Sequence, residues 1–282
     1  MVERDYFRHD FEGPRRRSFW ATIPGTKGII IGLVAIHALV VLSKSMAPAA
    51  FDWIQTYLYL SPDDVLRNFY VWQLVTAALL HDPDGLMHIL FNSLMIFFMG
   101  RMVEQRLGLR RYLWFCLLAA VSASVVYILW AIFMQVRVPM VGASGTVMGM
   151  LALVALWYPT LTVMVWGVLP MKMATLALIL IGIDLLFVFS TSGNVANSAH
   201  LGGALFGWLY YRYGGRVQHV FSEMDRRADR KRAHKEQRRV VEADKMRREV
   251  DRILDKVNRE GLSALTEAER RYLERAGKRL RQ

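Results

Sequence analysis

Residues 139–159 read PMVGASGTVMGMLALVALWYP, and the interpretation of the whole chain depends on this stretch. Most of it is apolar enough for a membrane helix, yet Gly142-Ala143-Ser144-Gly145 stands where that helix would begin. Ser144 is either a small residue that lets two helices approach closely or a nucleophile. Both interpretations fit these four letters, so the rest of the chain has to distinguish between them.

The composition indicates an apolar membrane body joined to basic segments. Of the 282 residues, 54% are hydrophobic, and the formal net charge is nevertheless +12. This combination is unusual for one soluble domain. Cys116 is the only cysteine, which excludes a disulfide framework within the chain and a cysteine-rich metal site. The first 25 residues are polar and carry Arg15-Arg16-Arg17, so no secretory signal peptide is expected.

Six apolar stretches predict membrane-spanning helices, each of which takes roughly 20 residues. The expected spans are 27–42, 86–101, 112–134, 144–157, 171–189 and 198–213. The predicted fold class is therefore all-α: a polytopic membrane protein with a six-transmembrane-helix bundle, a short fourth helix and a helical tail.

The distribution of Lys and Arg predicts the orientation of these spans. The N-terminal segment, the loop after the second span and the C-terminal tail are basic. The alternate loops (45–85, 135–143 and 190–197) carry only Arg67 and Arg137. Because basic loops stay on the cytoplasmic side, both termini are expected in the cytoplasm and the protein in the plasma or inner membrane.

Polar side chains within a membrane span are costly and mark functional sites. The candidates in these spans are His88, Asn92, Ser144, Asp184 and His200. Each alone also fits a structural role, such as hydrogen bonding between helices. All except Asp184 lie toward the outer ends of spans two, four and six, so we expect them to share one pocket. A hydroxyl, an imidazole base and side-chain donors are the groups that acyl transfer needs.

Three motifs lie on these spans: His88-x-x-x-Asn92, Gly142-x-Ser144-Gly145 and Ala199-His200-x-Gly202-Gly203-x-x-x-Gly207. Together they resemble the signatures of the rhomboid family of intramembrane serine proteases. Gly100-Arg101-x-x-Glu104 and Trp72 are similar to further family features, and the resemblance covers about residues 25–215.

The resemblance implies an endopeptidase that cleaves single-span membrane proteins near the outer face of the lipid bilayer. Ser144 is the expected nucleophile and His200 its general base, in a dyad without a third, acidic member. His88 and Asn92 are expected to join the Ser144 backbone N–H in the oxyanion hole. Asp184 is expected to lie apart from the motif residues, in a structural hydrogen bond. No cofactor and no metal ion are expected.

Small residues are expected to set the spacing of the helices. The resemblance and the spacing together assign helix packing to Gly142, Gly145, Gly203 and Gly207, which would bring His200 within reach of Ser144. The chain departs from the family pattern at Trp72-Gln73, where Arg is usual after Trp, and at Met148, where an aromatic residue is common. These departures bear on substrate preference and rate.

Other functions fit the sequence less well. The alternative is a catalytically inactive rhomboid-like protein that binds membrane clients; the presence of both Ser144 and His200 favours the enzyme. A transporter predicts internal repeats and broken helices, and we find no internal repeat. An α/β-hydrolase is excluded by the membrane body and because Gly142-Ala143-Ser144-Gly145-Thr146 lacks the Gly-x-Ser-x-Gly elbow.

The tail has a different character from the membrane body. We expect four parts: a cytoplasmic segment (1–25), the rhomboid-like membrane domain (26–215), a charged helical linker (216–250) and a small helical hairpin (251–282). Thr266-x-x-Glu269 predicts a capping box in the hairpin. The hairpin resembles a module at the C-terminus of some bacterial rhomboid-like proteins. It is either a docking element of unknown partner or a helix pair lying on the membrane; nucleic-acid binding is not expected.

Overall fold

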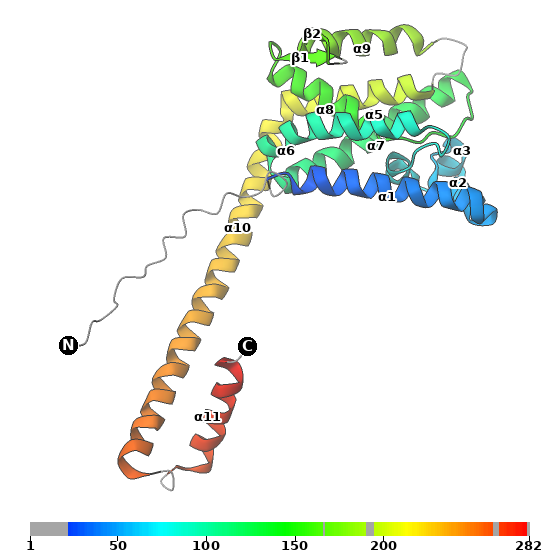
Figure 1. The fold of residues 1–282 in the computed structure, drawn as a ribbon. Helices are drawn as coiled ribbons and strands as arrows, with labels where there is room; N and C mark the ends of the chain where they lie inside the picture. Colours follow the sequence, from blue (N-terminus) through cyan, green and yellow to red (C-terminus); the bar gives the residue numbers. More distant parts are fainter. Residues whose placement is uncertain (1–21, 166, 190–194, 262–264, 281–282) are drawn as a thin grey trace. The chain divides into compact units, whose positions relative to one another are not determined.

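A computed structural model describes residues 22–165, 167–189, 195–261 and 265–280 (Figure 1). The predicted N-terminal segment 1–25 lies almost entirely outside these residues. The chain is mostly helical and forms two compact units, Met1–Gly214 and Gly215–Gln282.

Each stretch predicted as a span contains helix. The helices are α1 (Pro24–Met46), α5 (Leu86–Met95) with its continuation through the π-helical turn η3 (Ile96–Gly100) and α6 (Arg101–Leu107), α7 (Leu109–Met134), α8 (Ser144–Trp157), α9 (Met173–Phe187) and the first part of α10 (Val195–Glu260). Among the described residues, three helical segments are long and apolar enough to cross a membrane: Pro24–Met46, Leu86–Leu107 and Leu109–Met134. α8 and α9 are apolar but shorter, so the count of six spans stays a prediction.

The loop between α1 and α5 folds into a compact element of short helices. They are α2 (Pro48–Leu58), α3 (Pro62–Arg67), α4 (Gln73–Thr76) and η2 (Ala77–Leu79). Buried Gln73 accepts a hydrogen bond from the Ser61 N–H at 3.0 Å and donates to the Thr56 carbonyl at 3.1 Å. Trp72 Nε1 donates to the Tyr57 carbonyl at 2.7 Å. Gln73, which departs from the family pattern, therefore joins separate parts of this loop by hydrogen bonds.

A β-hairpin that the sequence analysis did not predict precedes α9. Strand β1 (Thr162–Val165) pairs antiparallel with β2 (Leu169–Lys172). Gly167 adopts a φ of 75°, which a glycine tolerates, and Pro170 disfavours helix in this segment. Helix α9 consequently begins at Met173 rather than at the predicted residue 171.

Helix α8 lies at the centre of the first unit. Every residue from Gly145 to Ala155 is buried, and α8 contacts α7, α9, α5 and η3 (Figure 1). A helix that is enclosed on all sides has no polar face, which explains its uniformly apolar sequence. Ser144 is thus the half-buried first residue of the most enclosed helix.

Glycines bring the backbones of α8 and α10 into direct contact. A Cβ atom on Gly203 would lie 1.8 Å from the Gly145 carbonyl oxygen, and one on Gly207 would lie 2.3 Å from that of Gly149. Neighbouring Gly202 faces α7 instead, where a Cβ would lie 2.9 Å from Ala123 Cα. The first turns of α10 therefore pack tightly against two helices because three positions carry no side chain.

Glu104 on α6 fixes the start of α1. Its buried carboxylate accepts hydrogen bonds from the Gly25 and Thr26 N–H groups at 2.8 and 2.7 Å. The first N–H groups of a helix lack partners within the helix, and a carboxylate satisfies both their hydrogen bonds and the positive end of the helix dipole.

The second unit contains the described helical residues of α10 after Gly214 and α11 (Glu267–Leu280). The predicted capping box is confirmed: the Glu269 N–H donates to Thr266 Oγ1 at 3.3 Å and the Thr266 N–H donates to Glu269 Oε2 at 3.0 Å. Lys256 on α10 also contacts this carboxylate at 3.0 Å. The Thr266 N–H and Lys256 together lower the pKa of Glu269 to about 2.

The glycine contact predicts the effect of adding one methyl group. Gly203→Ala should destabilise the membrane domain by about 3 kcal/mol, because the Gly145 backbone would have to move. Gly182→Ala on α9 is the matched control, since a Cβ there meets nothing within 4 Å. This control should be neutral or slightly stabilising in a helix. Thermal unfolding in detergent measures both, and equal melting temperatures for the two variants would contradict the contact.

Candidate active site

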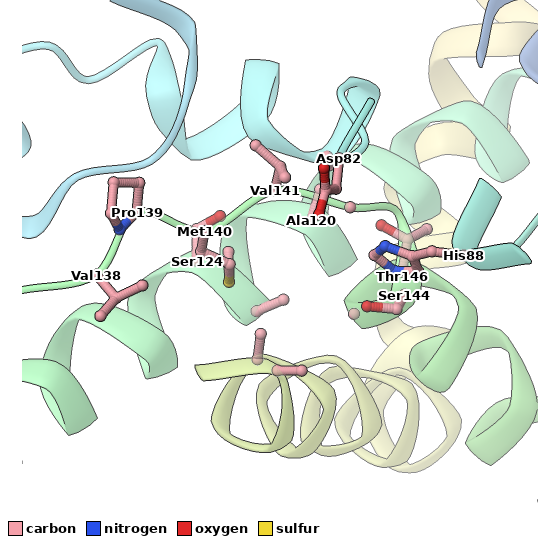
Figure 2. Close-up of a pocket in the computed structure, with 16 residues that line it drawn as sticks. Asp82, His88, Ala120, Ser124, Val138, Pro139, Met140, Val141, Ser144 and Thr146 are labelled. Carbon is pink, nitrogen blue, oxygen red and sulfur yellow. The ribbon is translucent and has the colours of Figure 1, made fainter. Parts of the chain in front are cut away.

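A cavity of about 320 Å³ opens beside the start of α8 (Figure 2). Its apolar lining comes mainly from the segment before α8 and from small residues of α7 and α10. Its polar lining residues are Asp82, His88, Ser124, Ser144 and Thr146. The cavity therefore combines a hydroxyl and an imidazole with a largely apolar wall.

The segment that leads into Ser144 is held on both sides. Met140 pairs with Leu60 through two backbone hydrogen bonds of 2.9 and 3.1 Å, and the Gly142 N–H donates to the Ala77 carbonyl at 2.9 Å. The hydroxyl of Tyr127 on α7 donates to the Val138 carbonyl. The folded loop between α1 and α5 and helix α7 thereby position the start of α8.

The N-terminus of α8 is free to bind an anion. The Val147 N–H makes the first backbone bond of the helix, to the Ala143 carbonyl at 3.0 Å. Ala143, the residue before the helix, makes no side-chain capping bond. The N–H groups of Ser144, Gly145 and Thr146 therefore have no partner within the helix, and the helix dipole adds a positive potential. Such a helix start stabilises an oxyanion.

His88 from the first turn of α5 reaches Gly142. A Cβ on Gly142 would lie 2.8 Å from His88 Cε1, 3.1 Å from its Nε2 and 3.8 Å from Ser144 Oγ, so the three residues meet. Figure 2 shows the imidazole beside the Ser144 side chain. Gly142 also adopts a φ of 128°, which disfavours any side chain. Gly142 was expected to pack helices; here it makes room for an imidazole.

Asn92 lies one turn further along α5 and is not among the residues that line the cavity. Its side chain is buried, and its Nδ2 lies 2.9 Å from Nε2 of His81. The His81 ring is fully buried and lies 5.1 Å, centroid to centroid, from the His88 ring in an edge-on arrangement. The sequence analysis assigned no role to His81. The position of His81 shortly before His88 in the sequence is the signal that could have indicated its place beside the site.

Burial determines the protonation state of His81. Burial, with smaller contributions in the same direction from the neighbouring His88 and from His37 on α1, lowers the pKa of this imidazole to about 4. His81 is therefore neutral at physiological pH and keeps a lone pair on Nε2. That lone pair accepts a hydrogen bond from the Asn92 amide, which fixes the amide orientation.

His200 on α10 contacts the carboxylate of Asp184 on α9. His200 Nδ1 lies 3.0 Å from Asp184 Oδ1, and their side chains are 22% and 9% exposed. The expectation that Asp184 lies apart from the motif residues, and that His200 has no acidic partner, is wrong. Helix α9 ends at Phe187, so Asp184 lies in its last turn, and its carboxylate reaches His200 on the next helix.

Ser144 and His200 lie on backbones that touch. A Cβ on Gly145 would lie 3.2 Å from the Ala199 carbonyl, so the residues next to Ser144 and His200 are in contact. Among the described residues, no hydrogen bond joins the two side chains; catalytic hydrogen bonds often tighten only when substrate binds. Asp184 occupies Nδ1 of His200, which makes Nε2 the nitrogen that can accept a proton.

Two protein families match the chain. The Rhomboid domain matches residues 68–216, and a family of unknown function (DUF6576) matches residues 228–279. The first match contains all the motif residues discussed above. The second covers the charged part of α10 and most of α11.

Curated relatives carry rhomboid names. RHOMBOID-like protein 12, mitochondrial, of Arabidopsis thaliana is 26% identical over 72% of this chain and 65% of its own length. Rhomboid protease GluP of Bacillus subtilis is 33% identical over 49% of this chain and 25% of its own length. Rhomboid protease GlpG of Yersinia pseudotuberculosis is 27% identical over 66% of this chain and 61% of its own length. The chain thus spans less than two thirds of each of these relatives.

Buried neutral His81 predicts a loss of stability in acid. The pKa of His81 is about 4 in the folded protein and near 6.5 in the unfolded chain. Between these two pH values the imidazole therefore binds a proton in the unfolded chain but not in the folded one. The free energy of unfolding should fall by about 3 kcal/mol between pH 6.5 and 4 from this residue alone. His81→Gln keeps an acceptor for Asn92 without titrating. Its unfolding, measured in detergent across this window, should depend less on pH; an unchanged slope would contradict the assignment.

Proposed function

Because the chain belongs to the rhomboid family, we propose that it is an intramembrane serine endopeptidase that cleaves transmembrane substrates near the outer face of the membrane. One observation carries the proposal: Ser144 begins the uncapped helix α8 in a cavity, beside the imidazole of His88. The backbone contact between Gly145 and Ala199, which brings the start of α8 to that of α10, also supports it.

The proposed first step is attack of Ser144 on the substrate carbonyl carbon. As the Oγ–C bond forms, the hydroxyl proton passes to Nε2 of His200 and the carbonyl oxygen becomes an oxyanion. When the oxyanion collapses, the C–N bond breaks and the leaving amine takes the proton from His200. Water then attacks the acyl-enzyme by the same route, with His200 again as the base, and releases the second product.

The oxyanion hole combines backbone and side-chain donors. The free N–H groups at the start of α8 supply a positive potential, and His88 places a ring nitrogen next to Gly142 and Ser144. Asn92 lies one turn further along α5 and contacts His81, and we assign it the role of orienting the site around His88. Loss of one oxyanion donor costs on the order of 100- to 1,000-fold in rate.

The membrane setting follows from the charge pattern. We assign the protein to the plasma or inner membrane with both termini in the cytoplasm and the cavity open to the outer side. Its substrates would be single-span membrane proteins that reach Ser144 from the lipid bilayer. The partner of the C-terminal hairpin is unknown, and neither a cofactor nor a metal ion has a part in this chemistry.

A catalytically inactive client-binding protein is the alternative function. The observation that favours it is that, among the described residues, no hydrogen bond joins Ser144 to His200. Both functions need the cavity, but only the enzyme needs a nucleophilic Ser144. Reactivity of that hydroxyl therefore separates the two.

A fluorophosphonate probe tests whether Ser144 is a nucleophile. The purified protein should be labelled, whereas Ser144→Ala and His200→Ala should lose labelling and cleavage of a single-span helical substrate. His88→Ala should lower cleavage by about 100-fold or more because an oxyanion donor is lost. The wild type and all three variants should melt at similar temperatures. Equal labelling of wild type and Ser144→Ala would exclude the protease and leave the client-binding alternative.

A further inference from the structure

We infer that Asp184 is a positioning residue for His200, which extends the expected dyad of Ser144 and His200 by a third residue. This inference rests on the proposed protease function and adds a residue that the motif resemblance excluded. The starting observation is the 3.0 Å contact between Asp184 Oδ1 and His200 Nδ1, across two different helices.

Asp184 is a conspicuous exception on its helix. Its side chain is buried, whereas the flanking large residues Ile183, Leu185 and Leu186 are exposed as a lipid-facing surface would be. An ionisable residue on so apolar a helix is costly and needs a partner. Among the described residues, the hydrogen bonds and ion pairs give the Asp184 carboxylate one side-chain partner, which is His200.

The contact decides which nitrogen of His200 can act as a base. A carboxylate accepts a hydrogen bond but does not donate one, so Nδ1 must carry the proton and Nε2 the lone pair. Nε2 is the atom that takes the Ser144 proton in the proposed first step. When that proton arrives, the imidazolium gains a neighbouring negative charge, while Asp184 itself stays ionised.

Anchoring of α9 alone does not explain the carboxylate. Helix α9 is held independently at the same end, because Trp130 Nε1 on α7 donates to the Val188 carbonyl at 2.8 Å. Apolar packing of Ala177 and Met173 adds further attachment along α9. The two anchors can therefore be tested separately: one touches His200 and the other does not.

The decisive variant is Asp184→Asn. An amide can donate to Nδ1 and so favour the tautomer that has its proton on Nε2, which cannot accept a proton from Ser144. We expect the rate of fluorophosphonate labelling and kcat to fall by about 10- to 1,000-fold, with KM within about twofold of wild type. Asp184→Glu keeps the carboxylate and should recover part of the lost rate.

Trp130→Phe is the matched control. It removes the hydrogen bond that anchors the same end of α9 without touching His200. We expect it to lower the melting temperature at least as much as Asp184→Asn does, with a labelling rate within a few-fold of wild type. A purely structural Asp184 predicts the opposite pattern, in which both variants lose stability and labelling together.

The outcomes separate this inference from the proposed function. If wild type is labelled, Ser144→Ala is not, and Asp184→Asn is labelled at the wild-type rate, then the protease stands and the role of Asp184 is overturned. Parallel losses of stability and rate in Asp184→Asn and Trp130→Phe would also overturn it. If the wild type is neither labelled nor able to cleave the substrate, the proposed protease function is contradicted, and the role of Asp184 that depends on it is contradicted as well.

Discussion

The direct contact between the backbones of α8 and α10 is the constraint on which the rest of the site depends. Gly145, Gly149, Gly203 and Gly207 let carbonyl oxygens of one helix occupy the space that Cβ atoms of the other would fill. Apolar side chains gain little by packing against each other rather than against lipid, so close van der Waals contact has to hold such helices together. The same contact puts the residue before Gly145, Ser144, near the residue after Ala199, His200.

Polar groups around this contact are satisfied in pairs that cross between elements. His81 accepts from Asn92, His200 contacts Asp184, and Glu104 accepts from the first N–H groups of α1. A polar group without a partner is costly where water is absent, so each of these contacts stabilises the packing of the elements that it joins. At the start of α8 the N–H groups lack a capping side chain and lie beside the cavity, so a reaction that develops negative charge can use them.

The sequence analysis predicted most helices correctly because helices depend on local patterns, and the same kind of pattern indicated the motif residues as candidates. Apolar runs indicate helices in a membrane, and a cluster of polar residues within such runs is a strong signal. The β-hairpin before α9 was missed because two four-residue strands within an apolar region resemble the edge of a span. The contact of Asp184 with His200 was missed for another reason, because it joins two different helices and no spacing within one helix indicates it.

The sequence by itself determined which residues have unusual chemistry and which small residues allow close packing. It indicated Ser144, His88, Asn92 and His200 together with the glycines, because residue type and spacing along one helix are local properties. Only the tertiary structure decided the pairs: Asp184 with His200, Asn92 with His81, and Gly142 with the His88 ring. Each pair joins different segments of the chain, and the distance between their atoms is set by helix packing and loop anchoring, which no spacing within one segment encodes.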